Sequence, residues 1–245
     1  MSGQAPSTAN DPAPQFPETF TMPDAHVTIT DVVPLSPDDP RGAGLAAAAL
    51  PLVMGGMIGA ILISSAIHGS RRRLVALGVY TLVAGIAISA ILGGWFGALQ
   101  GNYWLNVLAI TLSIGAISAT LVGLRGMFGS PGLAFGAVLM FFFANPISGA
   151  AMPPEFLVGS WGVVGQWFPP GAGQTLIRTL SYFPEASTGH QWFVLGGWTL
   201  IGLVLLWMGS IKHKRLQHAS LAAAEQEAQQ SAGSDDLAKP GLANV

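Results

Sequence analysis

The residue types that usually carry out chemistry are scarce in this sequence and form no recognisable catalytic set. The 245 residues include no cysteine, which excludes disulfides, thiol catalysis and thiolate metal sites. No Gly-x-x-x-x-Gly-Lys-Ser/Thr phosphate loop is present. The histidines are not paired with carboxylates at metal-ligand spacing and lie outside the apolar segments: His26, His68, His190, His213 and His218. We therefore predict no enzyme activity, no cofactor and no metal.

The most concentrated functional groups are basic. His68 is followed by the consecutive residues Arg71, Arg72 and Arg73. Guanidinium groups can pair bidentately with carboxylates on a protein partner. The same cluster can instead fix the orientation of a membrane protein and bind anionic lipid. Both interpretations remain open at the level of the sequence.

The composition indicates which kind of protein presents these groups. Hydrophobic residues make up 51% of the chain, charged residues only 9%, and the mean hydropathy is +0.52. A soluble domain carries about 25% charged residues, so most of this protein's surface does not face water. The net charge of −2 argues against nucleic acid as a partner, because phosphate binding requires a basic surface.

Charged residues disappear in long blocks, and these blocks predict the fold class. A helix needs about 20 apolar residues to cross a bilayer. The blocks fit five transmembrane helices, with the longest block divided at residues 97–102 between two aromatic pairs. We predict an all-α integral membrane protein with spans at about 43–67, 74–96, 104–125, 128–146 and 191–211, forming a transmembrane domain over 42–211.

The tails and the basic residues fix the expected orientation. Residues 1–41 are rich in proline and acids and predict a weakly structured tail outside the cell, and residues 212–245 predict a cytoplasmic tail. With the N-terminus outside and five spans, eight of the ten Lys and Arg residues lie inside. We expect a bacterial cytoplasmic (inner) membrane location, with the lipid bilayer as the first partner.

The segment 147–190 lies outside in this scheme but is too apolar for a simple loop. Pro153-Pro154 and Glu155 favour the start of a short helix. A second helix is predicted after Pro169-Pro170, with an apolar face formed by Leu176, Ile177, Leu180 and Phe183. We predict two short helices that lie in the outer membrane interface or dip into it.

Glycine pairs at a spacing of four favour close helix packing. General packing within the chain is favoured over dimerisation for each of the three pairs, which are Gly55/Gly59, Gly93/Gly97 and Gly132/Gly136.

Two segments of the outer region also carry a resemblance. They are 145–157 (NPISGAAMPPEFL) and 165–178 (GQWFPPGAGQTLIR), and the approach to the first span, 31–44 (DVVPLSPDDPRGAG), adds to them. Together they resemble bacterial type-two ABC exporter permeases, particularly the YhgE/Pip-like branch, over about residues 28–211. The residues of the outer motif that we single out are Asn145, Pro146, Glu155, Pro169, Pro170, Gly171 and Arg178.

The resemblance implies a fold and a function. Such permeases usually have six spans, a large outer domain after the first, and two short helices before the last. The five spans here would match family spans two to six, without the first span and most of the outer domain. The resemblance implies a separate ATPase subunit contacting the inner loop at His68, Arg71, Arg72 and Arg73, an oligomer with another permease chain, and a lipid-like or hydrophobic substrate. The alternative is a membrane scaffold or accessory protein that transports nothing.

Overall fold

The helices of this protein were analysed in a computed structural model that describes residues 36, 37, 39, 40, 42–150 and 152–238. All regular structure in these residues is helical. Four helices are long and apolar enough to cross a membrane: α1 (Ala43–Ala66), α2 (Ser70–Ala90) with its π-helical continuation η1 (Ile91–Trp95), α3 (Tyr103–Phe128), and the part of α7 (Gly189–Ala238) up to Ala223. The protein is therefore an all-α, membrane-embedded protein, as the charge-free blocks predict.

The fourth predicted span, 128–146, is shorter than expected. It forms α4 (Ser130–Val138), which continues as a π-helical segment, η2 (Leu139–Ala144). Fifteen helical residues rise only ~22 Å, which is less than the ~30 Å of a hydrocarbon core. Pro131 lies in the first turn, and Asn145-Pro146 ends the helix because proline cannot continue the backbone hydrogen-bond pattern.

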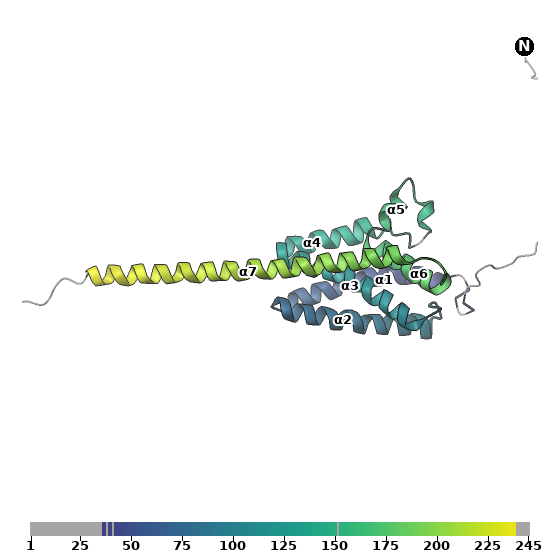
Figure 1. Ribbon diagram of the computed structural model, residues 1–245, viewed down its shortest axis with the longest axis horizontal. Helices are drawn as coiled ribbons and strands as arrows, with labels where there is room; N and C mark the ends of the chain where they lie inside the picture. Colours follow the sequence, from purple (N-terminus) through teal and green to yellow (C-terminus); the bar gives the residue numbers. More distant parts are fainter. Residues whose placement is uncertain (1–35, 38, 41, 151, 239–245) are drawn as a thin grey trace, which may run out of the picture. The chain divides into compact units, whose positions relative to one another are not determined.

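Helix α3 lies at the centre of the bundle. It packs against α1, α2, α4, α6 (Pro169–Tyr182) and α7, and its most extensive contact is with α7 (Figure 1). In its most apolar stretch 78% of the residues are buried, compared with 22% in α2. Helix α2 therefore presents most of its surface to the surroundings, which for a membrane-embedded chain are lipid or another protein.

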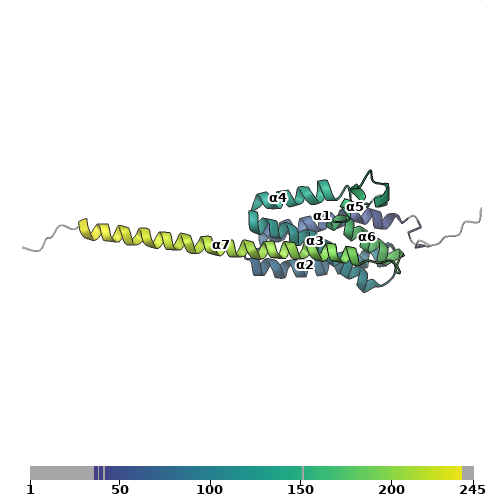
Figure 2. The ribbon, with the colours of Figure 1, turned by 45° about the horizontal axis from the view of Figure 1, so that its top comes forward.

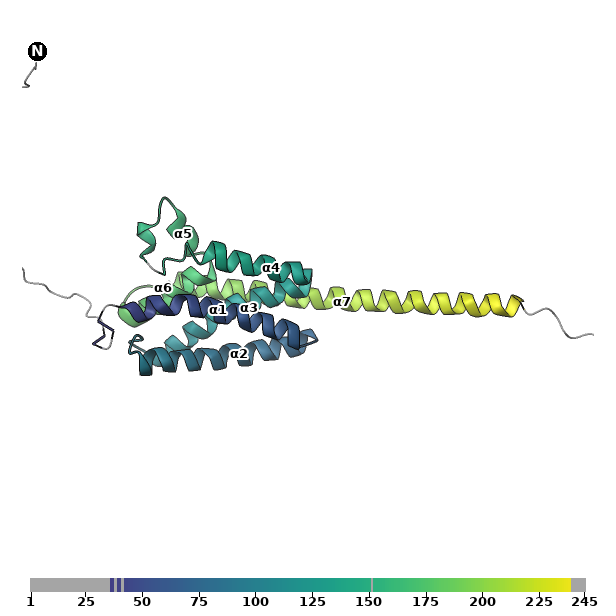
Figure 3. The ribbon, with the colours of Figure 1, turned by 180° about the vertical axis from the view of Figure 1, so that it is seen from behind.

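Close backbone contacts establish the directions of the helices. Gly123 of α3 lies against Gly202 of α7, and Gly126 lies against Gly209, so these two helices are parallel. Helix α1 runs in the same direction, whereas α2 and α4 run in the opposite direction (Figures 2 and 3). The described side chains of α7 beyond Lys212 are exposed, where the helix extends past the other spans.

Glycines at two of the three predicted pairs are used for packing within the chain. Tyr80 of α2 lies over Gly55 and Gly59 of α1, and its hydroxyl donates to the Gly55 carbonyl at 2.6 Å. Gly132 and Gly136 bring α4 against α3. The third pair, Gly93/Gly97, does not lie on one helix face, because Gly97 follows η1 with a φ of 59°.

The turn between α2 and α3 falls where the sequence predicts it. Residues 96–102 connect η1 to α3, and the Asn102 side chain accepts hydrogen bonds from the amides of Trp104 at 3.0 Å and Leu105 at 3.2 Å. This N-cap satisfies amides that a helix start leaves without partners. The predicted N-terminal tail, 1–41, lies almost wholly outside the described residues.

Candidate functional site

Helix α6 is inserted into the bundle. Its first five residues, 169–173, are buried, as are Leu176 at 0% and Ile177 at 1% exposure. Gly173 lies directly against Ser113, which is ten residues into α3 and so ~15 Å from its start. Helix α6 thus begins about halfway along α3.

The other end of α6 reaches the turn between α2 and α3. The Tyr182 hydroxyl donates to the Ala98 carbonyl at 3.0 Å, and Gly101 lies against the Leu180 carbonyl. Helix α6 therefore runs from the middle of the bundle to the end at which α1 begins.

The predicted apolar face of this second outer helix is buried within the bundle. Leu176 and Ile177 are buried inside the protein, Leu180 is half-buried, and Phe183 is 48% exposed. The apolar face is real, but it packs against α3 and α7. A hydrophobic helix face predicts burial, but it does not indicate whether the face packs against protein or against lipid, because both are apolar.

Aromatic side chains hold the buried start of α6. The Trp198 indole of α7 donates to the Trp167 carbonyl at 2.8 Å, and its ring lies 5.7 Å from that of Phe168. Phe143 of η2 contacts the same Phe168 ring at 5.6 Å. The residues just before α6 are therefore fixed between η2 and α7.

The two motif segments of the outer region are joined by polar contacts. Gln166 donates from its side-chain amide to the Ser148 carbonyl at 3.2 Å and accepts from the Thr175 hydroxyl at 2.7 Å. Ser148 in turn donates from its hydroxyl to the Asn145 carbonyl at 2.6 Å.

Arg178 lies at the edge of this group, with Nη2 at 3.4 Å from the carbonyls of Gly149 and Ala150. Gln166 and Thr175 were not among the predicted site residues, although both are polar positions in an apolar segment.

The remaining motif residues shape the backbone or lie at the surface. Pro169 and Pro170 occupy the first turn of α6, where proline costs no hydrogen bond, and Gly171 approaches the Gly165 carbonyl where a Cβ would lie 2.3 Å away. Glu155 is exposed in the single 3₁₀ turn η3 (Pro154–Phe156), which replaces the first of the two predicted helices together with the short α5 (Trp161–Gly165).

Helices α1 and α3 end, and α2 and α4 begin, at one end of the bundle (Figure 1), and basic residues of the chain lie at these helix ends. We call this the basic end; its arginines are Arg71, Arg72, Arg73 and Arg125. Arg73 does not point outward. Its Nε donates to the Ile67 carbonyl at 2.8 Å and its Nη2 to the Ser64 carbonyl at 3.0 Å, so it satisfies carbonyls at the end of α1.

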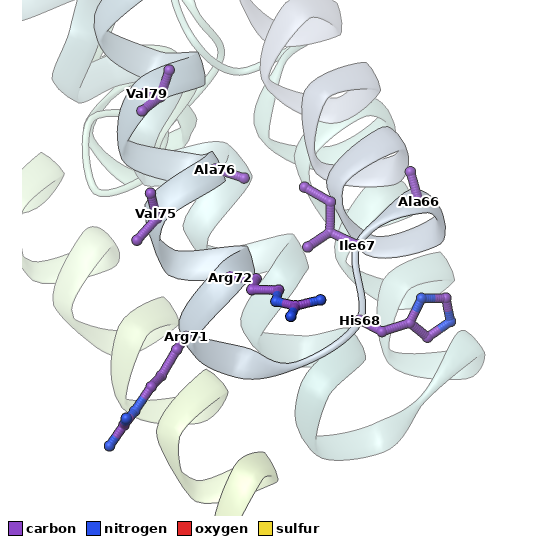
Figure 4. A pocket seen from close by; sticks show the side chains of 8 residues that line it. All are labelled: Ala66, Ile67, His68, Arg71, Arg72, Val75, Ala76 and Val79. Carbon is purple, nitrogen blue, oxygen red and sulfur yellow. The ribbon is translucent and has the colours of Figure 1, made fainter.

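His68, Arg71 and Arg72 remain exposed, and they line a groove of about 740 Å³ together with apolar side chains of α1 and α2 (Figure 4). The Arg72 side chain lies between the end of α1 and the start of α2. The side chains of Arg71 and His68 border the groove on opposite sides, and their charged or polar ends point outward. We call this the α1–α2 groove; it is lined by Ala66, Ile67, His68, Arg71, Arg72, Val75, Ala76 and Val79.

No group of three His, Asp or Glu residues within the described part of the chain could hold a metal ion. Comparison of this chain with protein-family models, with curated proteins and with solved structures finds no match.

Proposed function

We propose that this chain is the permease-type membrane subunit of an ABC exporter that moves a lipid-like or hydrophobic compound. The observation that carries the proposal is the insertion of α6 before the last span, together with the resemblance of 145–157 and 165–178 to such permeases. The resemblance implies two short helices before the last span. In this chain Gln166 and Ser148 tie the two resembling segments to each other.

The basic end supports the proposed orientation. Arg71, Arg72, Arg73 and Arg125 lie at the end past which α7 extends toward Lys212 and Arg215. Lys and Arg are enriched on the cytoplasmic side of membrane proteins. This distribution supports an N-terminus outside and a C-terminus in the cytoplasm, and the membrane that we propose is a bacterial inner membrane.

A substrate path requires a second chain. The centre of the bundle is filled by α3, whose side chains Ile110, Ile114, Ile117 and Leu121 are essentially completely buried. Helix α2, by contrast, exposes large apolar side chains such as Val79 and Val83. The proposed path lies on the outside of this bundle, against another permease chain in a homo- or hetero-oligomer.

ATP-driven work requires a separate ATPase subunit. Its proposed contact is the loop at the basic end, where His68 and Arg71 extend outward and Arg72 lies beside them. Arg73 contributes indirectly by fixing the end of α1. Because the link between α1 and α2 is short, motion of a docked subunit would pass directly into both helices.

The alternative function is that of a membrane scaffold. The observation that favours it is α7, which continues to Ala238, well beyond the membrane-spanning part, and presents exposed side chains after Lys212. A long exposed helix is a suitable surface for a partner protein.

Purification of the tagged full chain from native membranes in mild detergent distinguishes the two functions. The permease predicts a co-purifying ATPase at a fixed ratio and ATP-dependent export of a lipophilic compound that stops when the chain is deleted. The double substitution His68→Ala with Arg71→Gln should release the ATPase, whereas Lys212→Gln with Arg215→Gln should not. A complex without any ATPase, and export that survives the deletion, would favour the scaffold.

A further inference from the structure

The α1–α2 groove combines positive charge with an apolar wall. Arg72, Val75 and Val79 follow one another at the i, i+3 and i+7 positions of α2, so they lie on one face of that helix (Figure 4). Val75 is 66% exposed and Val79 is 58% exposed. The basic end thus continues without interruption into an apolar strip along α2.

The positive charge at this groove is not neutralised within the described residues. Neither Arg71 nor Arg72 forms an ion pair or a side-chain hydrogen bond there. The first amides of α2 add to the positive field, because Gly69 at its N-cap provides no side-chain hydrogen bond. The groove therefore lacks an anion that would match its charge.

The apolar side chains of the groove indicate that the bound anion carries a hydrocarbon part. Helix α2 is one of the four membrane-crossing helices, and Val75 and Val79 lie in its first three turns. A soluble phosphate or an acidic peptide segment would meet Arg72 but would leave the valines uncovered. A molecule with a phosphate at one end and a hydrocarbon chain at the other covers both parts.

We propose that the α1–α2 groove is a binding site for an anionic phospholipid, with the lipid phosphate at Arg72 and an acyl chain along Val75 and Val79. The groove extends from the basic end along the first three turns of α2, so that a lipid of the adjacent leaflet can reach both parts. The site does not depend on transport or on an ATPase. It belongs to the chain whether the protein is a permease or a scaffold.

The test measures lipid preference in the purified full chain. The protein is equilibrated in mixed micelles that contain equal amounts of phosphatidylglycerol and phosphatidylcholine, and the lipids that co-purify with it are quantified by mass spectrometry. We expect phosphatidylglycerol to be enriched. The substitution Arg72→Gln should lower this enrichment about five-fold, which corresponds to the ~1 kcal/mol that one arginine contributes near an anionic surface.

Two further variants separate a site from general attraction. Arg215→Gln removes the same charge from an exposed position of α7 that does not line the groove, and it should change the enrichment less than about two-fold. Val79→Trp fills the groove without changing the charge, and it should lower the amount of bound phosphatidylglycerol. All variants are compared with the wild type by thermal unfolding, so that a misfolded protein is recognised.

Three outcomes would overturn the proposal. Enrichment that is unchanged in Arg72→Gln would show that the groove does not hold the phosphate. An equal loss in Arg215→Gln and Arg72→Gln would show diffuse attraction to the surface. Loss of a co-purifying protein from Arg72→Gln, with lipid enrichment unchanged, would assign the groove to that protein.

Discussion

The contact between α3 and α7 gives a quantitative prediction for the substitution Gly202→Ala. A Cβ at Gly202 would lie 2.3 Å from the carbonyl carbon of Ala119 and 2.5 Å from the amide nitrogen of Thr120. Ordinary contacts begin at 3.4 Å, and both neighbours are backbone atoms that no rotamer change can move. The two helices must therefore separate by about 1 Å, which weakens the dispersion contacts along their interface.

Overpacking of this kind costs about 1–3 kcal/mol. For a chain of this size a loss of 1 kcal/mol lowers the Tm by about 2–4 °C, so Gly202→Ala should lower it by about 2–12 °C. The assay is thermal unfolding of the full chain in detergent, followed by fluorescence-detected size-exclusion chromatography. The substitution Gly209→Ala should produce a similar loss, because its Cβ would lie 2.3 Å from the Gly126 carbonyl oxygen.

The matched control is Gly196→Ala, six residues earlier in the same helix. A Cβ at Gly196 would meet no atom within 4 Å, so the same chemical change adds no clash there. Its Tm should equal or exceed that of the wild type, since alanine favours helix over glycine by up to about 1 kcal/mol. If Gly202→Ala unfolds at the same temperature as Gly196→Ala, the close α3–α7 contact is refuted.

Three further predictions concern other parts of the bundle. Arg73→Gln should lower the Tm in the same assay, because it leaves carbonyls at the end of α1 without their donor, at a cost of about 1–3 kcal/mol. Leu176→Asp should sharply reduce the yield of folded protein, since it places a carboxylate in a fully buried position, whereas Phe183→Asp at the exposed end of the same segment should be tolerated. A cysteine at Gln100 should react with an impermeant maleimide on intact cells and one at Ser220 only after lysis; labelling of Ser220 from outside would contradict the proposed orientation.

The long helices could be predicted from the sequence because the signal for them is local. Charge-free blocks of sufficient length specify apolar helices whatever their neighbours are. The turn at 97–102 was also predictable, because aromatic pairs flank a stretch with glycines and Asn102, a good N-cap residue. Each of these features depends only on residues adjacent in the chain.

The functions of individual arginines could not be predicted in the same way. Arg71, Arg72 and Arg73 are identical in type and adjacent in sequence, yet Arg73 turns back to α1 while Arg72 lies over the groove. Successive residues of a helix point about 100° apart, so the position of α1 decides which arginine meets its last carbonyls. That position is a tertiary property, and a count of positive charges does not contain it.

The contact between α3 and α7 was missed for a different reason. The search for glycines at a spacing of four finds a motif on one helix, but this interface uses Gly123 and Gly126 at a spacing of three and Gly202 and Gly209 at a spacing of seven. Spacings of three and seven also return to the same helix face. Small residues on two distant segments therefore have to be considered together, because only their combination brings the backbones into contact.

The shortness of α4 and the insertion of α6 are two aspects of one arrangement. Helix α4 with η2 rises from the basic end and stops at Asn145-Pro146, short of a full crossing, while α6 begins halfway along α3 and continues to the opposite end. The two helical segments together cover the length that one span would cover, and residues 145–168 connect them. In a membrane, backbone outside helices must be satisfied within the protein. The hydrogen bonds of Ser148 and Gln166 meet part of this requirement, and for this reason polar residues persist there in an otherwise apolar segment.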